Sequence, residues 1–394
     1  MVITLPTAVE TAIQQLNTAG YEAYAVGGCV RDSLLGKTPT DWDITTSATP
    51  TEMQGVFASY RTVETGLKHG TLTVLIDDMP LEITTYRVEG AYSDGRHPDS
   101  VSFTRCLSED LCRRDFTINA MAYHPVAGVV DLYGGREDLT NGLISCVGES
   151  EKRFSEDALR ILRALRFASV LGFRITKDTE CAIRALYPTL SCVSIERIAT
   201  ELGKLLCGTS AQRIVSDCFE VVLYLIPELQ GAKDFYLLSI VPPVSVARWA
   251  ALFYCCDLSS EAVGAVLRRL RLDNHTIRDV KTLIDCRYMP HDSDGDLLRL
   301  LNRLNDGELL RDYLALVEMD GDTCLHIERL IAENRCYKTA MLAVSGDDVI
   351  ACGFHGPEIG SVLAVLLNAV MDGNCQNEKQ ELIAYMKTIK KPVQ

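Results

Sequence analysis

A change in hydrophobic pattern near residue 150 is the feature that most constrains how this chain can fold. Before that point, short strand-like runs such as residues 71–76 and 81–86 are separated by turns and helical stretches. After it, apolar residues recur three and four positions apart, as in residues 158–167 and 194–206, which indicates amphipathic helices. The pattern predicts an α+β protein: an N-terminal head with a small mixed sheet and helices, followed by an all-helical remainder.

The length of 394 residues exceeds what a single hydrophobic core usually organises, so several domains are expected. Prolines at 227 and 242–243 and the acidic stretch 291–296 indicate breaks within the helical part. We therefore predict a head (residues 1–145), a helical neck (146–207), a helical body (208–320) and a helical tail (321–394).

Composition excludes several classes of protein. The formal net charge of −14 argues against broad, non-specific adhesion to nucleic acid but leaves room for a selective basic surface. No uncharged apolar stretch is long enough to cross a membrane, and the first ten residues lack a secretory pattern. The fifteen cysteines are scattered without a Cys-x-x-Cys pair, which favours reduced thiols in a cytoplasmic protein over disulfides or a zinc site. No protein partner is implied.

Asp41 and Asp43 are the first candidate catalytic residues. They are two positions apart around a predicted strand at residues 42–46, and side chains with that spacing on a strand point to the same side. Paired carboxylates suit Mg²⁺, which prefers ligand oxygens shared with phosphate and water. Two such ions about 3.5–4 Å apart can activate an attacking hydroxyl and neutralise a leaving pyrophosphate. For an isolated Asp-x-Asp, a solvated strand edge is the alternative.

Three neighbouring features strengthen that interpretation. Gly27 and Gly28 end a predicted strand and precede a short helix, where backbone N–H groups could approach a phosphate. Arg31 adds a forked cation for a triphosphate. Glu82, on the return strand of a predicted hairpin, is a candidate base for the attacking hydroxyl or a further metal ligand. A plain tight turn and an exposed strand glutamate are the alternatives.

Residues 26–32, followed by Asp-Trp-Asp at 41–43, resemble the signature of the class II tRNA nucleotidyltransferases of the DNA polymerase beta superfamily. These are the CCA-adding enzymes and the bacterial poly(A) polymerases. Four further motifs follow in the family's order, and the resemblance assigns each a role: residues 113–122 select ribose, 131–139 couple head and neck, 156–167 form the nucleotide-selecting helix, and 194–202 stabilise the neck. By this resemblance the nucleotide-binding residues are Gly28, Arg31, Arg114, Asp115, Asn119, Asp157, Arg160, Arg163 and Arg166.

Asp157 and Arg160 are three positions apart in the predicted nucleotide-selecting helix and would share one face. A carboxylate only accepts hydrogen bonds and a guanidinium only donates them. Cytosine and adenine both carry an amine beside a ring-nitrogen acceptor, so this pair could recognise either base. Uracil and guanine would leave buried groups unpaired at a cost of about 1–3 kcal/mol. An ordinary surface ion pair is the alternative.

The resemblance implies that C, C and A are added to the 3′ end of tRNA from CTP and ATP with Mg²⁺, while body and tail hold the acceptor arm. Residues 345–360 resemble the tail of Gram-positive CCA-adding enzymes. The polar stretch 90–99 matches a full-length form of the loop needed for the switch from C to A, which favours full CCA addition. A-adding or poly(A) polymerase specificity, and an inactive RNA-binding relative, remain alternatives.

His291 and Asp292 form a dipeptide of the kind found in metal phosphohydrolases, which also need a second His and a second Asp on facing helices. The neighbouring candidates, His275, Asp294 and Asp296, lie beside a proline and a glycine. We interpret this stretch as a solvated loop.

Overall fold

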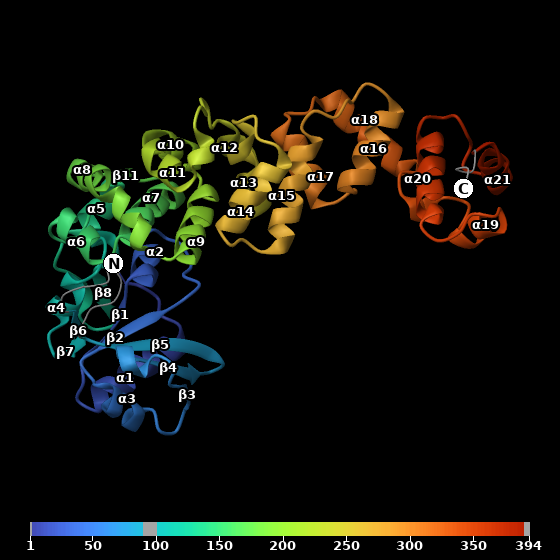
Figure 1. Cartoon of the computed structure of the whole chain (residues 1–394). Coiled ribbons are helices and arrows are strands. Elements are labelled where there is room, and N and C mark those ends of the chain that lie inside the picture. Colours follow the sequence, from blue (N-terminus) through green and yellow to red (C-terminus); the bar gives the residue numbers. More distant parts are fainter. Residues whose placement is uncertain (1, 90–100, 390–394) are drawn as a thin grey trace. The chain divides into compact units, whose positions relative to one another are not determined.

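The computed structural model describes residues 2–89 and 101–389 of the chain (Figure 1). It divides into two compact units, Met1–Pro227 and Glu228–Gln394. The finer division into head, neck, body and tail stays a prediction. The stretch 90–99, on which we based the expectation of a full-length loop, lies outside the described residues.

A seven-stranded mixed sheet forms the head, in the order β3-β4-β5-β2-β1-β8-β9. β2 pairs in parallel with β5, and the other neighbouring strands are antiparallel. This confirms the predicted α+β class with a small mixed sheet. The strands are β1 (Ala23–Val26), β2 (Asp43–Thr46), β3 (Arg61–Val63), β4 (Thr71–Ile76), β5 (Met79–Thr85), β8 (Met121–His124) and β9 (Gly128–Asp131).

Two smaller strand pairs complete the first unit. β6 (Arg87–Glu89) pairs with β7 (Val101–Phe103), and β10 (Leu143–Ile144) pairs in parallel with β11 (Arg174–Ile175). Because β11 follows the first long helix of the all-helical part, the β10–β11 pair ties that part to the head by backbone hydrogen bonds.

The hairpin predicted from residues 71–86 is present, with a tighter turn than expected. Asp77 and Asp78 have φ values of 49° and 60°, which is the left-handed geometry of a two-residue turn that matches strand twist. Met79 and Pro80 continue the pairing with β4, so β5 starts two residues earlier than the alternation predicted. The turn therefore lies at the end of the regularly paired strands β4 and β5.

Helices cover the sheet of the head, and local sequence determines where one of them begins. Thr49 caps α3 by accepting from the Glu52 N–H, while the Glu52 carboxylate accepts from the Thr49 N–H at 2.7 Å, and Pro50 occupies the first helical position. The helical segments of the head are α1 (Thr7–Thr18), α2 (Gly28–Leu34), α3 (Pro50–Val56), η1 (Leu67–His69), α4 (Leu107–Cys112), η2 (Thr117–Asn119) and α5 (Gly135–Asn141).

The rest of the first unit is helical except for β11. Its central helix, α7, packs along α9 and buries apolar side chains at the spacing that predicted an amphipathic helix, including Ile161, Leu162 and Leu165. The helical segments are α6 (Ser150–Glu156), α7 (Leu159–Leu171), α8 (Lys177–Leu186), η3 (Tyr187–Cys192), α9 (Ile195–Leu206), α10 (Ala211–Asp217) and α11 (Phe219–Leu225).

The second unit, taken by itself, is helical throughout its described residues. α13 packs against α15 and α17 around the fully buried Trp249, and α16 packs against α20. Its helices are α12 (Leu237–Ile240), α13 (Ser245–Tyr254), α14 (Ser260–Arg269), α15 (Asn274–Cys286), α16 (Asp294–Leu304), α17 (Glu308–Leu316), α18 (Gly321–Ala332), η5 (Thr339–Met341), α19 (Gly346–Ala351), α20 (Glu358–Met371) and α21 (Lys379–Thr388); η4 (Pro227–Leu229) lies at the division. No helix in the described part of either unit is long and apolar enough to span a membrane.

Candidate active site

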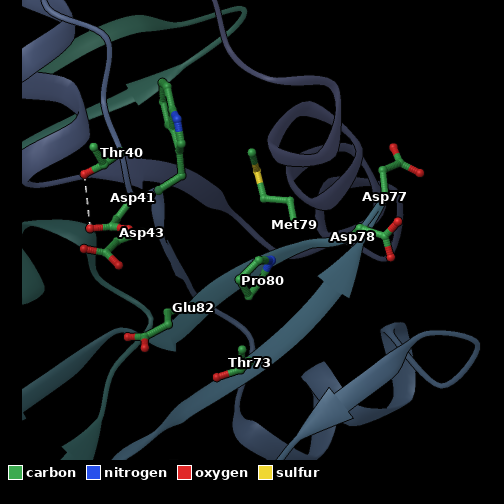
Figure 2. Close-up of a pocket in the computed structure, with 10 residues that line it drawn as sticks. Thr40, Asp41, Asp43, Thr73, Asp77, Asp78, Met79, Pro80 and Glu82 are labelled. Carbon is green, nitrogen blue, oxygen red and sulfur yellow. Dashed lines mark hydrogen bonds between the residues drawn. The ribbon is translucent and has the colours of Figure 1, made fainter. Parts of the chain in front are cut away.

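Three carboxylates gather at one end of the central strands (Figure 2). Asp43, the first residue of β2, lies opposite Glu82 in the parallel register with β5. Asp41 precedes β2 instead of lying on it, so our strand-based reason for its orientation is wrong, although both aspartates line one pocket of about 700 Å³. The pocket is lined by Thr40, Asp41, Trp42, Asp43, Thr73, Asp77, Asp78, Met79, Pro80 and Glu82.

The carboxylates repel one another, and the titration of Asp43 reflects this. Partial desolvation of its carboxylate raises the pKa of Asp43, the negative charges of Glu82 and Asp41 raise it further, and the charge of Arg114 opposes the rise. Among the described residues, no arginine, lysine or histidine lines the pocket itself. The site therefore holds an excess of negative charge that a bound cation would relieve.

This donor set fits a hard divalent cation. The polar side chains that line the pocket offer only carboxylate and hydroxyl oxygens. Among the described residues, no three His, Cys, Asp or Glu side chains lie close enough to form a complete metal cage. A cation at Asp41 and Asp43 would thus share its remaining positions with substrate oxygens and water, which is how Mg²⁺ is usually bound.

The glycine turn next to the pocket adopts a conformation that demands glycine. Gly27 has φ 83° and ψ −131° at the N-cap of α2, and a Cβ there would lie 3.3 Å from Nη1 of Arg114. α2 begins at Gly28, two residues before the helical stretch that we predicted. The turn therefore places the backbone of Gly27 beside the guanidinium of Arg114, while the guanidinium of Arg31 lies next to Gly28.

Arg31, on α2, is largely buried and contacts the motif at residues 113–122. Its Nη1 donates to Oδ1 of Asn119 at 2.7 Å, and its Nε and Nη2 donate to the Asp32 carboxylate at 2.9 Å each. Asn119 donates in turn to Asp115 at 3.2 Å. Three of the residues assigned to nucleotide binding by resemblance are thus joined in one hydrogen-bonded chain.

Asp115 connects the head to α7. Its Oδ2 accepts from Nε of Arg163 at 2.7 Å, and its Oδ1 accepts from the Phe116 N–H at 2.8 Å. Burial alone would raise the pKa of Asp115, but the charge and hydrogen bonds of Arg163, with those of Asn119, hold it at about 2. On the same helix, Nε of Arg166 lies 2.9 Å from Oε2 of Glu201 on α9.

Asp110, on α4, is a site residue that sequence reasoning missed. It is fully buried and accepts from Arg113 at 2.7 Å, from Arg114 at 3.2 Å and from Oγ1 of Thr45 at 3.1 Å. Burial would raise its pKa, but Arg114 and Arg113 outweigh this and lower it. The spacing of an acidic residue three and four positions before two arginines was the available signal.

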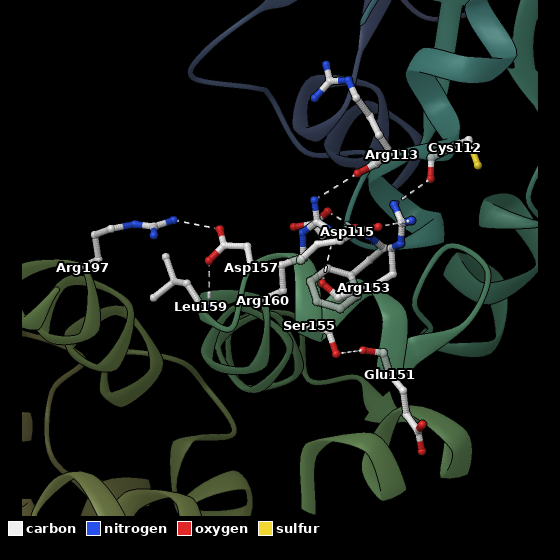
Figure 3. Close-up of polar contacts among 12 residues, drawn as sticks. Cys112, Arg113, Asp115, Glu151, Arg153, Ser155, Asp157, Leu159, Arg160 and Arg197 are labelled. Atoms are coloured by element: carbon white, nitrogen blue, oxygen red, sulfur yellow. Dashed lines mark hydrogen bonds and ion pairs between the residues drawn. The ribbon is translucent and has the colours of Figure 1, made fainter. Parts of the chain in front are cut away.

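Asp157 and Arg160 do not share a helix face, and that prediction is wrong (Figure 3). Asp157 is the extended residue that ends α6, with φ −142° and ψ 105°, and α7 starts at Leu159. Oδ1 of Asp157 accepts from the Leu159 N–H at 3.0 Å, so this side chain helps to start the new helix. The strong preference of aspartate for helix starts was the signal that a continuous helical pattern obscured.

The two side chains have different partners. Nη1 of Arg160 donates to Glu156 at 2.7 Å, and its Nη2 donates to the backbone oxygen of Arg113 at 3.1 Å. The partner of Asp157 is instead Arg197 on α9, whose Nη2 lies 2.8 Å from Oδ2. Arg197 belongs to the motif at residues 194–202, which we had assigned to neck stability alone. In the structure it contacts the carboxylate of Asp157, in the motif at residues 156–167.

The His-Asp dipeptide has a structural role in the second unit. Nε2 of His291 lies 2.8 Å from the Tyr313 hydroxyl, which donates to the backbone oxygen of Cys286 at 3.0 Å. Asp294 and Asp296 lie in the first turn of α16, capped by Ser293. Tyr313 thus gives His291 a structural partner, and our interpretation of the stretch as a solvated loop is wrong for Asp294 and Asp296, which belong to a helix.

Three family models match consecutive parts of the chain. They are described as Poly A polymerase head domain (residues 23–145), RNA and SrmB-binding site of polymerase A (172–231) and tRNA nucleotidyltransferase domain 2 (244–386).

Relatives match the chain over almost its full length. The CCA-adding enzyme of Enterococcus faecalis is 36% identical, covering 95% of this chain and 94% of the relative, and that of Geobacillus stearothermophilus is 37% identical, covering 95% of each. The crystal structure of the Bacillus stearothermophilus CCA-adding enzyme in complex with CTP superposes with a TM-score of 0.80 at 34% identity, covering 98% of each chain.

Proposed function

We propose that this chain, which belongs to the family of CCA-adding tRNA nucleotidyltransferases, adds C, C and A in turn to the 3′ end of tRNA from CTP and ATP, releasing pyrophosphate. The observation that carries this is the carboxylate pocket at Asp41, Asp43 and Glu82, which suits nucleotidyl transfer. In the same unit, the Asp115–Arg163 pair joins the head to helix α7, which suits nucleotide recognition.

Use of a divalent metal follows from membership of this nucleotidyltransferase family. We assign Mg²⁺ to Asp41 and Asp43, because hard oxygen donors line their pocket and the described lining holds no cationic side chain. When bound there, Mg²⁺ would make the 3′-hydroxyl of the RNA easier to deprotonate and neutralise charge on the departing pyrophosphate.

Glu82 is our candidate for accepting the proton of that hydroxyl. Its carboxylate lies beside Asp43 on the pocket wall, and it is exposed to solvent, so a proton could pass on to water. The 3′ oxygen then forms a bond to the α-phosphorus of the nucleotide as the bond to the pyrophosphate oxygen breaks.

The glycine turn and the arginines around it would bind the triphosphate and ribose. The N–H groups at the start of α2 are free of helical partners, and Gly28 allows a close approach. Arg31 and Arg114 provide forked cations on either side of that turn. Arg163 and Arg166 extend the positive surface onto α7, and Asp115 and Asn119 fix its orientation.

Base selection is assigned to the start of α7. We place the exocyclic amine of cytosine or adenine on Asp157, whose carboxylate is held from two sides and keeps acceptor capacity. Arg160 would donate to the ring nitrogen after its side chain leaves Glu156.

The second unit, which the tRNA nucleotidyltransferase domain 2 model matches, would hold the acceptor arm. All fifteen cysteines are free, as expected in the reducing cytoplasm, where we place the enzyme.

A direct test is to incubate the purified protein with tRNA lacking CCA, tRNA ending in C and tRNA ending in CC, with each nucleotide alone and in mixtures. The proposal predicts C on the first two substrates, a single A on the third, and no use of UTP or GTP. Long A tails would indicate poly(A) polymerase specificity, A on the third substrate alone would indicate an A-adding enzyme, and no incorporation on any substrate would indicate an inactive relative.

A further inference from the structure

Three arginines converge on the ring of Phe167, near the end of α7. The guanidinium carbons of Arg166, Arg31 and Arg163 lie 4.1, 5.1 and 5.4 Å from the ring centroid. Arg31 comes from α2 of the head, and the other two come from α7. A single aromatic side chain therefore contacts cations from both sides of the nucleotide site.

The head core fixes the orientation of that ring. Phe116, which is fully buried, meets Phe167 edge to face, with ring centroids 5.7 Å apart and planes at 80°. Phe167 itself is 8% exposed. Since Phe116 directly follows Asp115, the same short segment of the head anchors both the ring and the carboxylate that binds Arg163.

Clustering three like charges has an electrostatic cost that the structure records. Desolvation lowers the pKa of Arg166, and the charges of Arg163 and Arg31 lower it further, against the opposing effect of Glu201. Carboxylates can hold such a cluster together, but each one cancels a positive charge. Each of the three arginines already pairs with one carboxylate: Arg31 with Asp32, Arg163 with Asp115 and Arg166 with Glu201. The aromatic ring attracts all three guanidinium groups through its quadrupole and adds no further negative charge to the cluster.

We propose that Phe167 is a positioning residue that holds Arg31, Arg163 and Arg166 together as a preformed binding surface for the triphosphate of either nucleotide. This deepens the proposed function and rests on it. Because the ring contacts arginines and is not placed at the base-selecting Asp157, its contribution is to affinity for the phosphates of CTP and ATP alike and not to the choice of base.

The test replaces Phe167 by Leu, which keeps an apolar side chain but removes the ring. Because the three guanidinium groups lose their shared contact in Phe167→Leu, KM for both CTP and ATP should rise by roughly tenfold or more, with kcat far less affected. The ratio of CTP to UTP incorporation should not change. The Ki of inorganic tripolyphosphate, which has no base, should rise in parallel.

Replacing Phe167 with phenylalanines carrying one, two and three ring fluorines separates the ring's electronics from its size. Fluorine weakens the quadrupole with little change in volume, so KM should rise with each fluorine. The same series at Phe154 is the matched control, because this residue is fully buried on α6 and no cation lies over its ring among the described residues.

An unchanged KM along the fluorine series at Phe167, or an equal rise at Phe154, would overturn the proposal. So would a loss of base discrimination in Phe167→Leu, since the ring would then act through Asp157. If the wild-type protein incorporates no nucleotide into tRNA, the proposed function is wrong. If the wild-type enzyme incorporates C and A and its fluorinated forms have the same KM, only the proposed role of Phe167 is wrong.

Discussion

Asp43 and Glu82 lie at the same register position on the parallel strands β2 and β5, so two carboxylates lie side by side on neighbouring inner strands of the sheet. Burial raises the pKa of Asp43, and the charges of Glu82 and Asp41 raise it further, so keeping this carboxylate ionised has a cost that a bound cation would offset. Such a cost is typical of sites whose geometry serves chemistry and not folding.

Replacing Asp43 by Asn should therefore separate activity from stability. The amide keeps the shape of the side chain but binds Mg²⁺ poorly, so incorporation of C and A should fall to background. The thermal midpoint should stay equal or rise, because a repulsive charge is removed. Asp77→Asn, on the turn that lines the same pocket, is the control and should retain most activity. Substantial residual activity in Asp43→Asn would mean that the metal site is misplaced.

The buried Asp110 should matter mainly for folding of the head. Asp110→Asn leaves the guanidinium groups of Arg113 and Arg114 without their carboxylate, and breaking a buried pair from one side typically costs about 3–5 kcal/mol. Denaturant unfolding of the variant and the wild type measures this loss in the free energy of unfolding. Glu180→Gln, which removes an exposed pair with Arg184 on α8, should cost under about 1 kcal/mol. Equal effects of the two would contradict the burial argument.

Arg197 should affect base choice although it belongs to the neck motif. In Arg197→Ala the Asp157 carboxylate keeps only its hydrogen bond from the Leu159 N–H, so its direction is less well defined. We expect incorporation of UTP and GTP to rise relative to CTP and ATP, with Arg197→Lys intermediate. Competition assays with mixed nucleotides measure this. Unchanged selectivity in Arg197→Ala would show that Asp157 needs no partner on α9.

Asp312, on α17 in the second unit, should make stability depend on pH. Burial raises its pKa to about 6, with Glu308 adding to the rise and Arg311 opposing it, whereas an unfolded-chain aspartate titrates near 3.9. Between about pH 4 and 6 the folded form keeps a proton that the unfolded chain has released, so the free energy of unfolding falls as pH rises through this window.

Asp312→Asn should abolish that part of the pH dependence and make the protein more stable than wild type at pH 7. Urea unfolding at pH 4, 5, 6 and 7 checks this. Asp320→Asn is the control. Asp320 is an exposed helix cap whose pKa is lowered, so its contribution to the free energy of unfolding increases as pH rises. Parallel pH profiles for wild type and Asp312→Asn would contradict the assignment.

The head could be predicted from the sequence in unusual detail because its signals are local. The capping box at Thr49 and Glu52, the hairpin and the glycine turn are each determined by a few adjacent residues. The meeting of Asp43 and Glu82 follows from a strand order that the sequence does not contain, since residues 47–78 separate β2 from β5 along the chain.

The neck was predicted less well because its contacts are cross-helical. A leucine pattern continuous from residue 158 suggested that Asp157 belongs to the same helix as Arg160, but the Asp157 side chain hydrogen-bonds the N–H of Leu159 and starts a new helix. The partners Arg197 and Phe116 come from distant segments, and spacing along the chain carries no information about them.

The most direct test of the whole account is to sequence the 3′ ends of tRNA lacking CCA after incubation with all four nucleotides and either wild-type protein or Asp157→Ala. The account predicts that wild type adds C, C and A and then stops, and that the variant still extends the tRNA but inserts U or G at a raised frequency. A wild-type enzyme that produces runs of A, or an Asp157→Ala enzyme as selective as wild type, would contradict it.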